Sequence, residues 1–192
     1  MRLQIFAVAV AIAGLCSAAL ANETYKFDRS GSTIGFTVHQ YLGTTHGKFT
    51  RFDGRIDLAR EHAEKSSVAA RIDVRSIDTG IKKRDDHLRS PEFFNVAKFP
   101  EIVFMSTHVS AVKKTADGWE LTLAGKLNLH GVEKPVSFPL RVRAAAGELR
   151  AQGEVSVLQT DHGITPIKVG GGSVKVKDKL KITFTIVATK AN

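Results

Sequence analysis

Apolar and polar residues alternate with a period of two through most of this chain. The clearest case is the stretch 121–129, where Leu121, Leu123, Leu127 and Leu129 share one parity. Successive side chains of a β-strand point to opposite faces, so this spacing predicts strands with one apolar and one polar face. Such strands are stable only when their apolar faces are buried against one another.

The same alternation, sometimes distorted, occurs in eight stretches separated by polar turns. In the second stretch, Phe49 falls out of phase with the other apolar residues, which predicts a bulge or bend near Thr50–Arg51. Residues 22–32 are interpreted as a leader, and 40–47 and 160–172 as loops that contain glycine. The expected strands are 33–39, 48–58, 67–75, 102–106, 121–129, 136–142, 149–157 and 180–188.

Eight one-sided strands predict an all-β fold. A closed antiparallel barrel buries all the apolar faces together and leaves no free strand edge, and a two-layer sandwich is the alternative. In the barrel, the Lys, Arg and Thr faces point outward. An eight-stranded barrel is wide enough to hold one small ligand.

The alternation is interrupted between Ser76 and Pro100, which separates three expected strands from five. Asp78 or Thr79 can cap a short helix in this segment, and Pro91 ends it. The helix has a thin apolar stripe and would not be stable alone. We therefore expect a short helical segment between the third and fourth strands, lying across one end of the barrel.

Charged and aromatic residues fill the rest of this segment. A charged run at 82–87 is followed by Leu88, Phe93, Phe94 and Phe99. Ion pairing within the run is favoured over acid–base chemistry, so we expect the run mainly to hold the shape of the segment. The phenylalanines are expected to close or line the interior, because the core of a barrel and its ligand cavity can be the same place.

The first 21 residues have the pattern of a secretory signal peptide, with a basic start, an apolar run and the site Ala19-Leu20-Ala21. Cleavage there would leave one domain, residues 22–192. An uncleaved anchor and a lipoprotein cysteine at Cys16 are the alternatives. Because Cys16 is the only cysteine, the exported chain would have none, which excludes thiol catalysis, cysteine-type zinc sites and iron–sulfur clusters. We expect a bacterial periplasmic protein stabilised by its core.

The formal net charge of +9 favours anionic partners such as lipid headgroups, phosphates, nucleic acid or an anionic envelope surface. The basic residues are scattered along the expected strands rather than gathered in blocks. This distribution is typical of a soluble basic surface, and we expect no nucleic-acid partner.

Motifs for hydrolases, phosphate-binding loops, dinucleotide sites and zinc proteases are absent from the sequence. Histidines are the only candidates for a metal or acid–base cluster, and His39 and His46 flank one loop. None of them pairs with another at helical spacing around a carboxylate. We interpret them as structural or solvated, and predict no catalytic residue, metal site or cofactor.

Several segments, in order along the chain, resemble one known family. The most specific is RDDHLRSPEFF at 84–94. The other matching segments are IGFTVH at 34–39, GKF at 47–49, DT at 78–79, KFP with Ile102 and Phe104 at 98–104, GKLNLHGV at 125–132 and HGI at 162–164. Together they resemble the YceI-like family of lipid- or polyisoprenoid-binding proteins over nearly the whole expected domain.

The resemblance implies an extended lipocalin-like antiparallel barrel, usually periplasmic and often dimeric. It also implies an elongated apolar tunnel that holds an isoprenoid chain, such as that of a polyprenyl quinone or polyprenyl phosphate. One departure concerns Gln159 and His162, which stand where members often carry Arg and Phe. If those positions touch the headgroup, the headgroup preference differs in this chain.

Together these observations predict a non-enzymatic periplasmic carrier with an isoprenoid lipid or quinone as ligand, transient approach to the membrane surface and a possible homodimer. The alternatives are an envelope-surface or stress protein with a filled core, and an enzyme acting on a lipid headgroup through histidines. The predicted tunnel lining is Phe36, Val38, Ile72, Val74, Phe93, Phe94, Phe99, Phe104, Leu121, Leu123, Leu127, Leu129, Phe138, Val155, Ile182, Phe184 and Ile186. The candidate headgroup contacts are His39, His46, Gln159 and His162.

Overall fold

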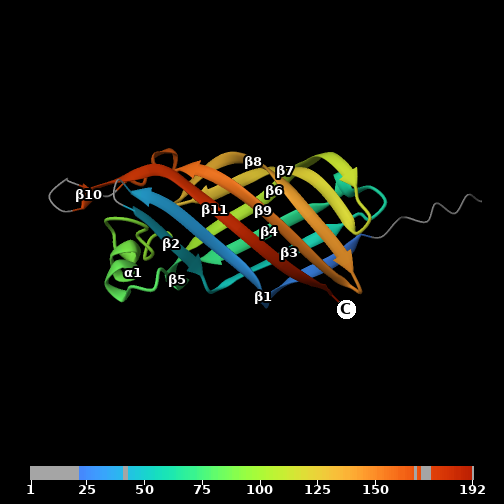
Figure 1. The fold of residues 1–192 in the computed structure, drawn as a ribbon, viewed down its shortest axis with the longest axis horizontal. Helices are drawn as coiled ribbons and strands as arrows, with labels where there is room; N and C mark the ends of the chain where they lie inside the picture. The colour runs from blue at the N-terminus through green and yellow to red at the C-terminus, as the bar shows by residue number, and fades with distance from the viewer. Residues whose placement is uncertain (1–21, 41–42, 167, 170–173, 192) are drawn as a thin grey trace, which may run out of the picture.

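The computed structural model describes residues 22–40, 43–166, 168–169 and 174–191. The expected signal peptide, residues 1–21, lies outside these ranges, as does part of the expected glycine-rich loop. The described strands form a closed antiparallel barrel around one hydrophobic core, with one short α-helix at an end of the barrel (Figure 1). The all-β barrel expected from the alternating pattern is confirmed.

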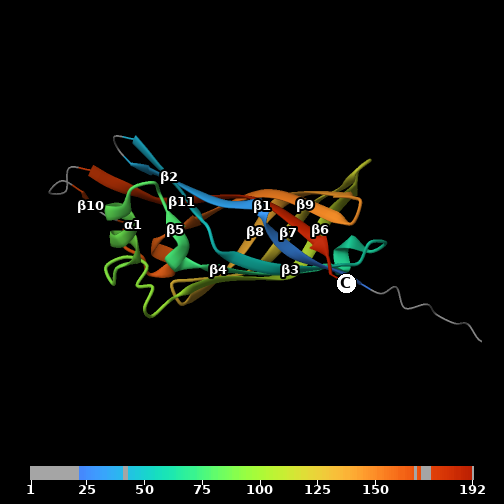
Figure 2. The ribbon, with the colours of Figure 1, turned by 90° about the horizontal axis from the view of Figure 1, so that it is seen from below.

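The barrel wall follows the order β1–β3–β4–β6–β7–β8–β9–β11, and β11 pairs with β1 to close the ring. Strands β2, β5 and β10 extend the sheet at the end where the helix α1 lies (Figures 1 and 2). The strands are β1 Glu23–Gln40, β2 Gly43–Phe49, β3 Phe52–Leu58, β4 Ser67–Asp73, β5 Ile77–Asp78, β6 Glu101–Lys114, β7 Gly118–Leu129, β8 Val132–Ala145, β9 Glu148–Leu158, β10 Lys168–Val169 and β11 Val174–Lys190. The helices are α1 Lys82–Arg89 and three 3₁₀ turns, η1 Ala63–Lys65, η2 Val74–Ser76 and η3 Thr160–His162.

Strand β1 is much longer than expected, because the predicted leader 22–32 belongs to it. Its register against β11 is irregular between Asp28 and Thr33. There the Asp28 carboxylate accepts a hydrogen bond from the Ser30 backbone N–H at 2.9 Å. This local bond replaces the regular pairing over a few residues, so the polar segment 28–33 interrupts the apolar alternation between Phe27 and Ile34.

The hairpin β1–β2 replaces the loop expected at 40–47, with regular pairing from Ile34↔Phe49 to Gln40↔Gly43. The break expected near Thr50–Arg51 is present, and it separates β2 from β3. At this break the Arg51 backbone N–H donates to the Ser76 hydroxyl at 3.0 Å. The β1 side of the hairpin stays paired with β11 in the barrel wall, whereas β2 pairs with β5, which contacts α1.

The helix α1 ends just before Ser90–Pro91 as predicted, but the expected cap is wrong. The residue before the helix is Ile81, which makes no capping hydrogen bond. Instead, the buried Asp85 carboxylate within the helix accepts hydrogen bonds from the backbone N–H and the hydroxyl of Thr79. Thr79 thus ties the incoming chain to the helix from outside its first turn.

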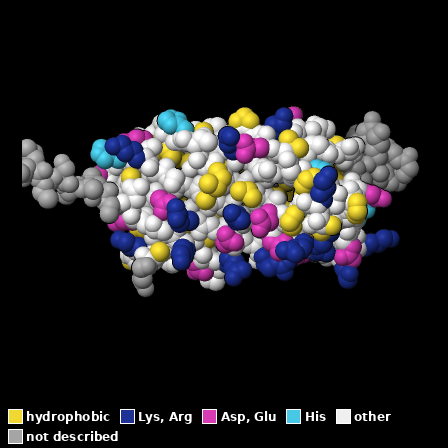
Figure 3. All heavy atoms as spheres, turned by 180° about the vertical axis from the view of Figure 1, so that it is seen from behind, with side chains coloured by type: hydrophobic (Ala, Val, Ile, Leu, Met, Phe, Trp, Pro, Cys, Tyr) yellow, Lys and Arg dark blue, Asp and Glu magenta, His cyan; other side chains and the backbone are white. Residues whose placement is uncertain are grey.

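Charged side chains of both signs are interspersed over the outer face of the barrel (Figure 3). Some of them pair across neighbouring strands, as in Lys126–Glu133 and Lys181–Glu154, both at 2.9 Å. Within the described part of the chain, no helix has the length and apolar character needed to cross a membrane.

Candidate functional site

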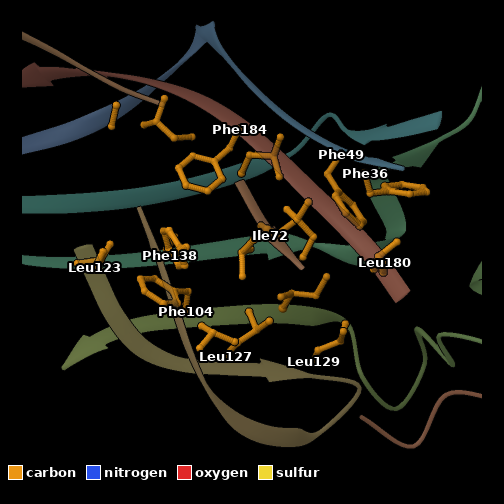
Figure 4. Close-up of a pocket in the computed structure, with 18 of the residues that line it drawn as sticks. Phe36, Phe49, Ile72, Phe104, Leu123, Leu127, Leu129, Phe138, Leu180 and Phe184 are labelled. Atoms are coloured by element: carbon orange, nitrogen blue, oxygen red, sulfur yellow. The ribbon is translucent and has the colours of Figure 1, made fainter. Parts of the chain in front are cut away.

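The barrel encloses an elongated cavity of about 720 Å³. Its wall is built from the apolar face of each barrel strand, and apolar side chains from several strands point into the space (Figure 4). Phe138 contacts two other aromatic rings of the wall, with its ring centroid 5.7 Å from that of Phe104 and 5.6 Å from that of Phe184. Cavities of about 300–1,000 Å³ enclose small-molecule ligands in proteins, so this volume suits a ligand rather than packing voids.

Glycine positions in the wall make room for these rings. Gly153 faces Phe184, and a Cβ added at Gly153 would lie 2.6 Å from the Phe184 ring. Gly125 faces Phe104 in the same way, at 2.6 Å. The two rings can therefore lie against the wall and leave the centre of the barrel open.

Most of the predicted lining residues lie on the cavity wall: those on strands share the inward parity of their strands, and Phe93 and Phe94 come from the turn that follows α1. Their contact with a ligand stays a prediction. Those on the wall are Phe36, Val38, Ile72, Phe93, Phe94, Phe104, Leu121, Leu123, Leu127, Leu129, Phe138, Val155, Ile182, Phe184 and Ile186.

Val74 and Phe99 are not part of the wall. Strand β4 ends at Asp73, and Val74 begins a 3₁₀ turn, so the strand parity no longer applies to its buried side chain. Phe99 packs on His130, with ring centroids 4.4 Å apart, and against the Cα of Gly131 in the β7–β8 turn. Phe99 therefore holds the segment after α1 against this turn.

Large apolar side chains line one end of the cavity, which we call the far end. Trp119 and Leu149 lie there and are buried. In the barrel wall at the same end, the Tyr25 hydroxyl donates to the Glu23 carboxylate at 2.6 Å, and Arg60 donates to the same carboxylate at 2.7 Å. Hydrogen bonding from Arg60 and Tyr25 lowers the pKa of Glu23 to about 2, whereas burial and the bond to Glu23 raise the pKa of Tyr25.

The other end, which we call the mouth, lies between α1 and the hairpin β1–β2. Gln40 and Thr45 from the hairpin and Arg84 from α1 all line the cavity there. The Thr45 hydroxyl oxygen accepts a hydrogen bond from the Gln40 amide at 2.7 Å and one from the Arg84 guanidinium at 3.4 Å. These contacts place polar groups of two separate elements at the rim of an otherwise apolar cavity.

The charged run of α1 was expected mainly to hold the shape of its segment, and this expectation is incomplete. Asp86 does so by pairing with Lys82 at 2.7 Å. Lys83, Arg84 and His87, however, line the cavity. Lys83 and His87 are four residues apart and therefore share one helix face.

Of the candidate headgroup contacts, Gln159 alone lies on the cavity wall. His39 and His46 are exposed on the hairpin, where each shares a hydrogen bond of 3.0 Å with a neighbouring threonine hydroxyl. The buried His162 donates from Nδ1 to the backbone carbonyl of Val132 at 3.0 Å and does not line the cavity. These three histidines therefore lie outside the cavity wall, and their contact with a headgroup stays a prediction.

The Gln159 side chain stabilises the cavity wall by bonding to the backbone of β11. Its amide nitrogen donates to the backbone carbonyls of Lys177 and Asp178, at 2.9 and 3.1 Å. These bonds use both amide hydrogens and anchor the end of β9 to the start of β11. In the described part of the chain, no three His, Cys, Asp or Glu side chains come close enough together to hold a metal ion.

Comparison with known proteins gives consistent matches. A family model for the YceI-like domain matches residues 25–188. The proteins named YceI from Salmonella arizonae and Salmonella paratyphi B are each 40% identical to this chain over 122 residues, which is 62% of this chain and 61% of each relative. The matched region therefore spans less than two thirds of these relatives.

Solved structures share the fold at low sequence identity. BcnA from Burkholderia cenocepacia has a TM-score of 0.73 at 23% identity and covers 85% of this chain and 99% of its own. A polyisoprenoid binding domain from Saccharophagus degradans, implicated in plant cell wall breakdown, has a TM-score of 0.68 at 17% identity, with 87% and 98% covered. A YceI protein from Campylobacter jejuni reaches 0.64 at 18%, with 80% and 89% covered. The family model covers most of the barrel, and the chain belongs to the YceI-like family.

Proposed function

We propose that this protein binds a long apolar lipid of the isoprenoid class inside its barrel. The observation that carries the proposal is the elongated cavity of about 720 Å³, whose wall is apolar along the barrel and polar at one end. A relative of the same fold from Saccharophagus degradans is described as a polyisoprenoid binding domain, which supports the choice of ligand class. A non-enzymatic binding role fits a wall in which polar groups are few.

Transfer of the lipid tail out of water would supply the driving force. Burial of each methylene group contributes about 0.8 kcal/mol. A tail of about forty carbons would then exceed the practical affinity limit of about 20 kcal/mol, so ordering of the tail and incomplete burial must offset much of this gain. The affinity therefore depends on how much of the tail the cavity covers.

We further propose that the protein acts as a carrier or store in the bacterial periplasm and approaches a membrane surface transiently. The leader pattern at 1–21 and the net charge of +9 support this location and this partner. A homodimer is expected from the family resemblance. Size-exclusion chromatography with light scattering measures the oligomeric state directly.

Purification from the native periplasm, followed by native mass spectrometry and organic extraction, tests the binding proposal. We expect a bound species of defined mass that extraction releases as an isoprenoid lipid. Recovery of an empty barrel under gentle conditions, together with no uptake of added polyprenyl compounds, would overturn it. Alanine replacement of His39, His46 and His162 is expected to leave binding intact, because these side chains lie outside the cavity wall.

A further inference from the structure

The barrel wall is not paired along the whole boundary between β4 and β6. Strand β4 pairs with β6 only over residues 69–73 of β4 and 101–105 of β6. Strand β6 continues to Lys114 and stays paired with β7 on its other side. On the β4 side, residues 106–114 pair with no strand in the part of the chain that the structure describes. This stretch of strand edge must therefore be covered by something other than a strand.

The segment 59–66, which joins β3 to β4, takes this place. Its 3₁₀ turn η1 contacts β6 and lies at the end of the barrel opposite α1 (Figures 1 and 2). Within the segment, Ala63 alone is buried, whereas residues 60–62 and 64–65 are exposed. Ala63 and Ser66 line the cavity. Two small side chains thus separate the cavity from solvent at this point of the wall.

The backbone of the segment is bonded to itself rather than to β6. His62, Lys65 and Ser66 each donate a backbone N–H to the carbonyl three residues earlier, at distances of 2.8 to 3.1 Å. The Ala59 backbone N–H donates to the Ser66 hydroxyl at 3.0 Å. Among the described residues, no backbone hydrogen bond joins the segment to β6. The segment can therefore move away from β6 as a unit while the bonds of the sheet and of its own turns stay intact.

One ion pair tethers the segment to β1. Arg60 Nη2 donates to the Glu23 carboxylate at 2.7 Å and to the Tyr25 hydroxyl at 3.0 Å. The Arg60 side chain is 44% exposed, and ion pairs at exposed positions contribute little to stability. Opening of the segment therefore requires the loss of one weak tether and of the packing of Ala63.

We propose that the segment 59–66 is a lateral gate in the barrel wall, which opens so that the end of a long lipid tail can leave the cavity sideways. This inference rests on the proposed lipid-binding function. A methylene group is similar in size to a water molecule, which takes about 30 Å³ in the liquid, so a tail of about forty carbons needs about 1,200 Å³. The cavity of about 720 Å³ cannot enclose such a tail. A tail that enters at the mouth reaches the gate at the far end, where no sheet hydrogen bond holds this part of the wall.

Cysteine labelling tests the gate without any ligand. Cys16 is the only native cysteine, so Ala63→Cys in a Cys16→Ser background gives a single thiol. The probe is a methanethiosulfonate that carries a quaternary ammonium group. Ala151→Cys is the matched control, because Ala151 is also buried and on the cavity wall but lies in β9, where it is paired on both sides.

If the segment opens locally, Ala63→Cys should react at least about tenfold faster than Ala151→Cys under native conditions. Global unfolding exposes both thiols alike. Equal rates would therefore show that the segment opens only with the whole barrel, and they would overturn the gate. Hydrogen exchange of the wild-type protein gives a second measure, in which the Ser66 amide should exchange faster than the Ala151 amide.

Variants of the segment test the tether. Arg60→Gln should raise the labelling rate of Ala63→Cys about threefold, since it removes the ion pair to Glu23. Lys65→Gln is the control, because it removes the same charge from an exposed side chain of the segment that is not a partner of Glu23. An effect of Arg60→Gln no larger than that of Lys65→Gln would overturn the role of Arg60 as the tether.

Two uncharged lipids of different length test the passage of the tail. The protein is loaded with the short alcohol geranylgeraniol or the long alcohol solanesol, and native mass spectrometry verifies the loading. We expect solanesol to raise the labelling rate of Ala63→Cys at least about threefold over geranylgeraniol, because its tail holds the gate open. Equal rates with the two lipids bound would overturn the passage of the tail through the gate. If neither alcohol binds, the proposed lipid function itself fails, whereas the comparison of Ala63→Cys with Ala151→Cys still decides whether the gate opens.

Discussion

The two ends of the barrel differ in how their charges are satisfied. At the far end, Glu23 is hydrogen-bonded to Tyr25 and Arg60 and lies 3.4 Å from Lys190, and Trp119 is buried. At the mouth, cationic side chains of α1 face the cavity without acidic partners among the described residues, and Ile81 is 52% exposed. The charges at the far end are paired with one another, whereas Lys83 and Arg84 at the mouth have no carboxylate partner among the described residues.

From this difference we expect the far end to stabilise the fold and, under the proposed function, the mouth to contact the ligand. Substitutions at the far end should mainly change the free energy of unfolding. Substitutions at the mouth should mainly change ligand binding. Substitutions in the wall between the two ends should change both the free energy of unfolding and ligand binding.

A charge in the middle of the wall should have the largest effect. Leu127 is buried and lines the cavity. Leu127→Arg would place an unpaired charge there, and we expect a loss of about 3 kcal/mol in the free energy of unfolding together with loss of polyprenyl uptake. Denaturant titration measures the free energy of unfolding, and a lipid-binding assay measures polyprenyl uptake. Asn128→Arg, on the outward parity of the same strand, is the control, and a folded Leu127→Arg that still takes up lipid would contradict the assignment of the cavity.

Truncation of a buried side chain at the far end should have the second-largest effect on stability. Trp119 is 6% exposed, and Trp119→Ala should lower the free energy of unfolding by about 3 kcal/mol because it leaves a void in the closed end. The mouth counterpart, Ile81→Ala, removes a largely exposed side chain and should change stability by less than about 0.5 kcal/mol. Urea unfolding of both variants tests the contrast. Equal losses would show that the mouth is packed as firmly as the far end.

Two glycines that face aromatic rings sharpen the comparison. A Cβ at Gly54 would meet both the Phe27 ring and, at 2.7 Å, the backbone carbonyl of Ala69. A Cβ at Gly47 would meet the Phe36 ring at the mouth. Because a ring can rotate and a strand backbone cannot shift freely, Gly54→Ala should cost about 2 kcal/mol and Gly47→Ala about 1 kcal/mol.

Thermal unfolding measures these costs, and ligand titration separates the two positions further. Phe27 and Phe36 both line the cavity, but only Gly54→Ala also strains the strand backbone at Ala69, so Gly47→Ala should alter lipid affinity more than Gly54→Ala relative to its effect on stability. The reverse order of stability losses would contradict the assignment of the rigid end.

The pH dependence of stability should show the smallest effect. The pKa of Glu23 falls from 4.5 to about 2 in the folded protein, chiefly through the hydrogen bond from Arg60. A lowered carboxyl pKa contributes stability that is complete above pH 4.5 and is lost as the pH falls toward 2. The Glu23 side chain is 25% exposed and screened by solvent, so Glu23→Gln should cost about 1 kcal/mol at pH 7.

Urea unfolding of wild type and Glu23→Gln at several pH values tests this contribution. The difference between them should shrink as the pH falls from 4.5 toward 2. Asp86→Asn, at the exposed ion pair of α1, is the comparison at the mouth. A difference for Glu23→Gln that stays constant with pH would show that the carboxylate charge is not what stabilises the far end.

Much of the barrel and its lining could be predicted because strand parity has only two outcomes. Once one face of Leu121–Leu129 is apolar, that face must point inward. The prediction failed for Val74 because a 3₁₀ turn begins there, and the point at which a strand ends depends on its neighbours. It failed for Phe99 because this side chain packs against His130, which lies in a turn far away in the sequence.

The mouth could not be predicted in the same way. The sequence shows that 82–87 is charged and helical, but which of its residues meet the cavity depends on where the helix docks. The rotation of α1 is set by the bonds of Thr79 to Asp85 and by Arg84 reaching Thr45, which is 39 residues away in the chain. The local periodicity of the sequence does not indicate contacts between residues that lie so far apart in the chain.

The amino-acid sequence by itself determined the strands, their inward faces and the apolar character of the interior, since these follow from a period of two and from the need to bury apolar surface. The tertiary structure alone decided that the two ends of the cavity are unlike. Closure of β1 against β11 pairs Tyr25 with Lys190 at the far end. Docking of α1 beside the β1–β2 hairpin brings Lys83 and Arg84 to the mouth, because the position of a short polar helix is determined by long-range hydrogen bonds rather than by its own pattern.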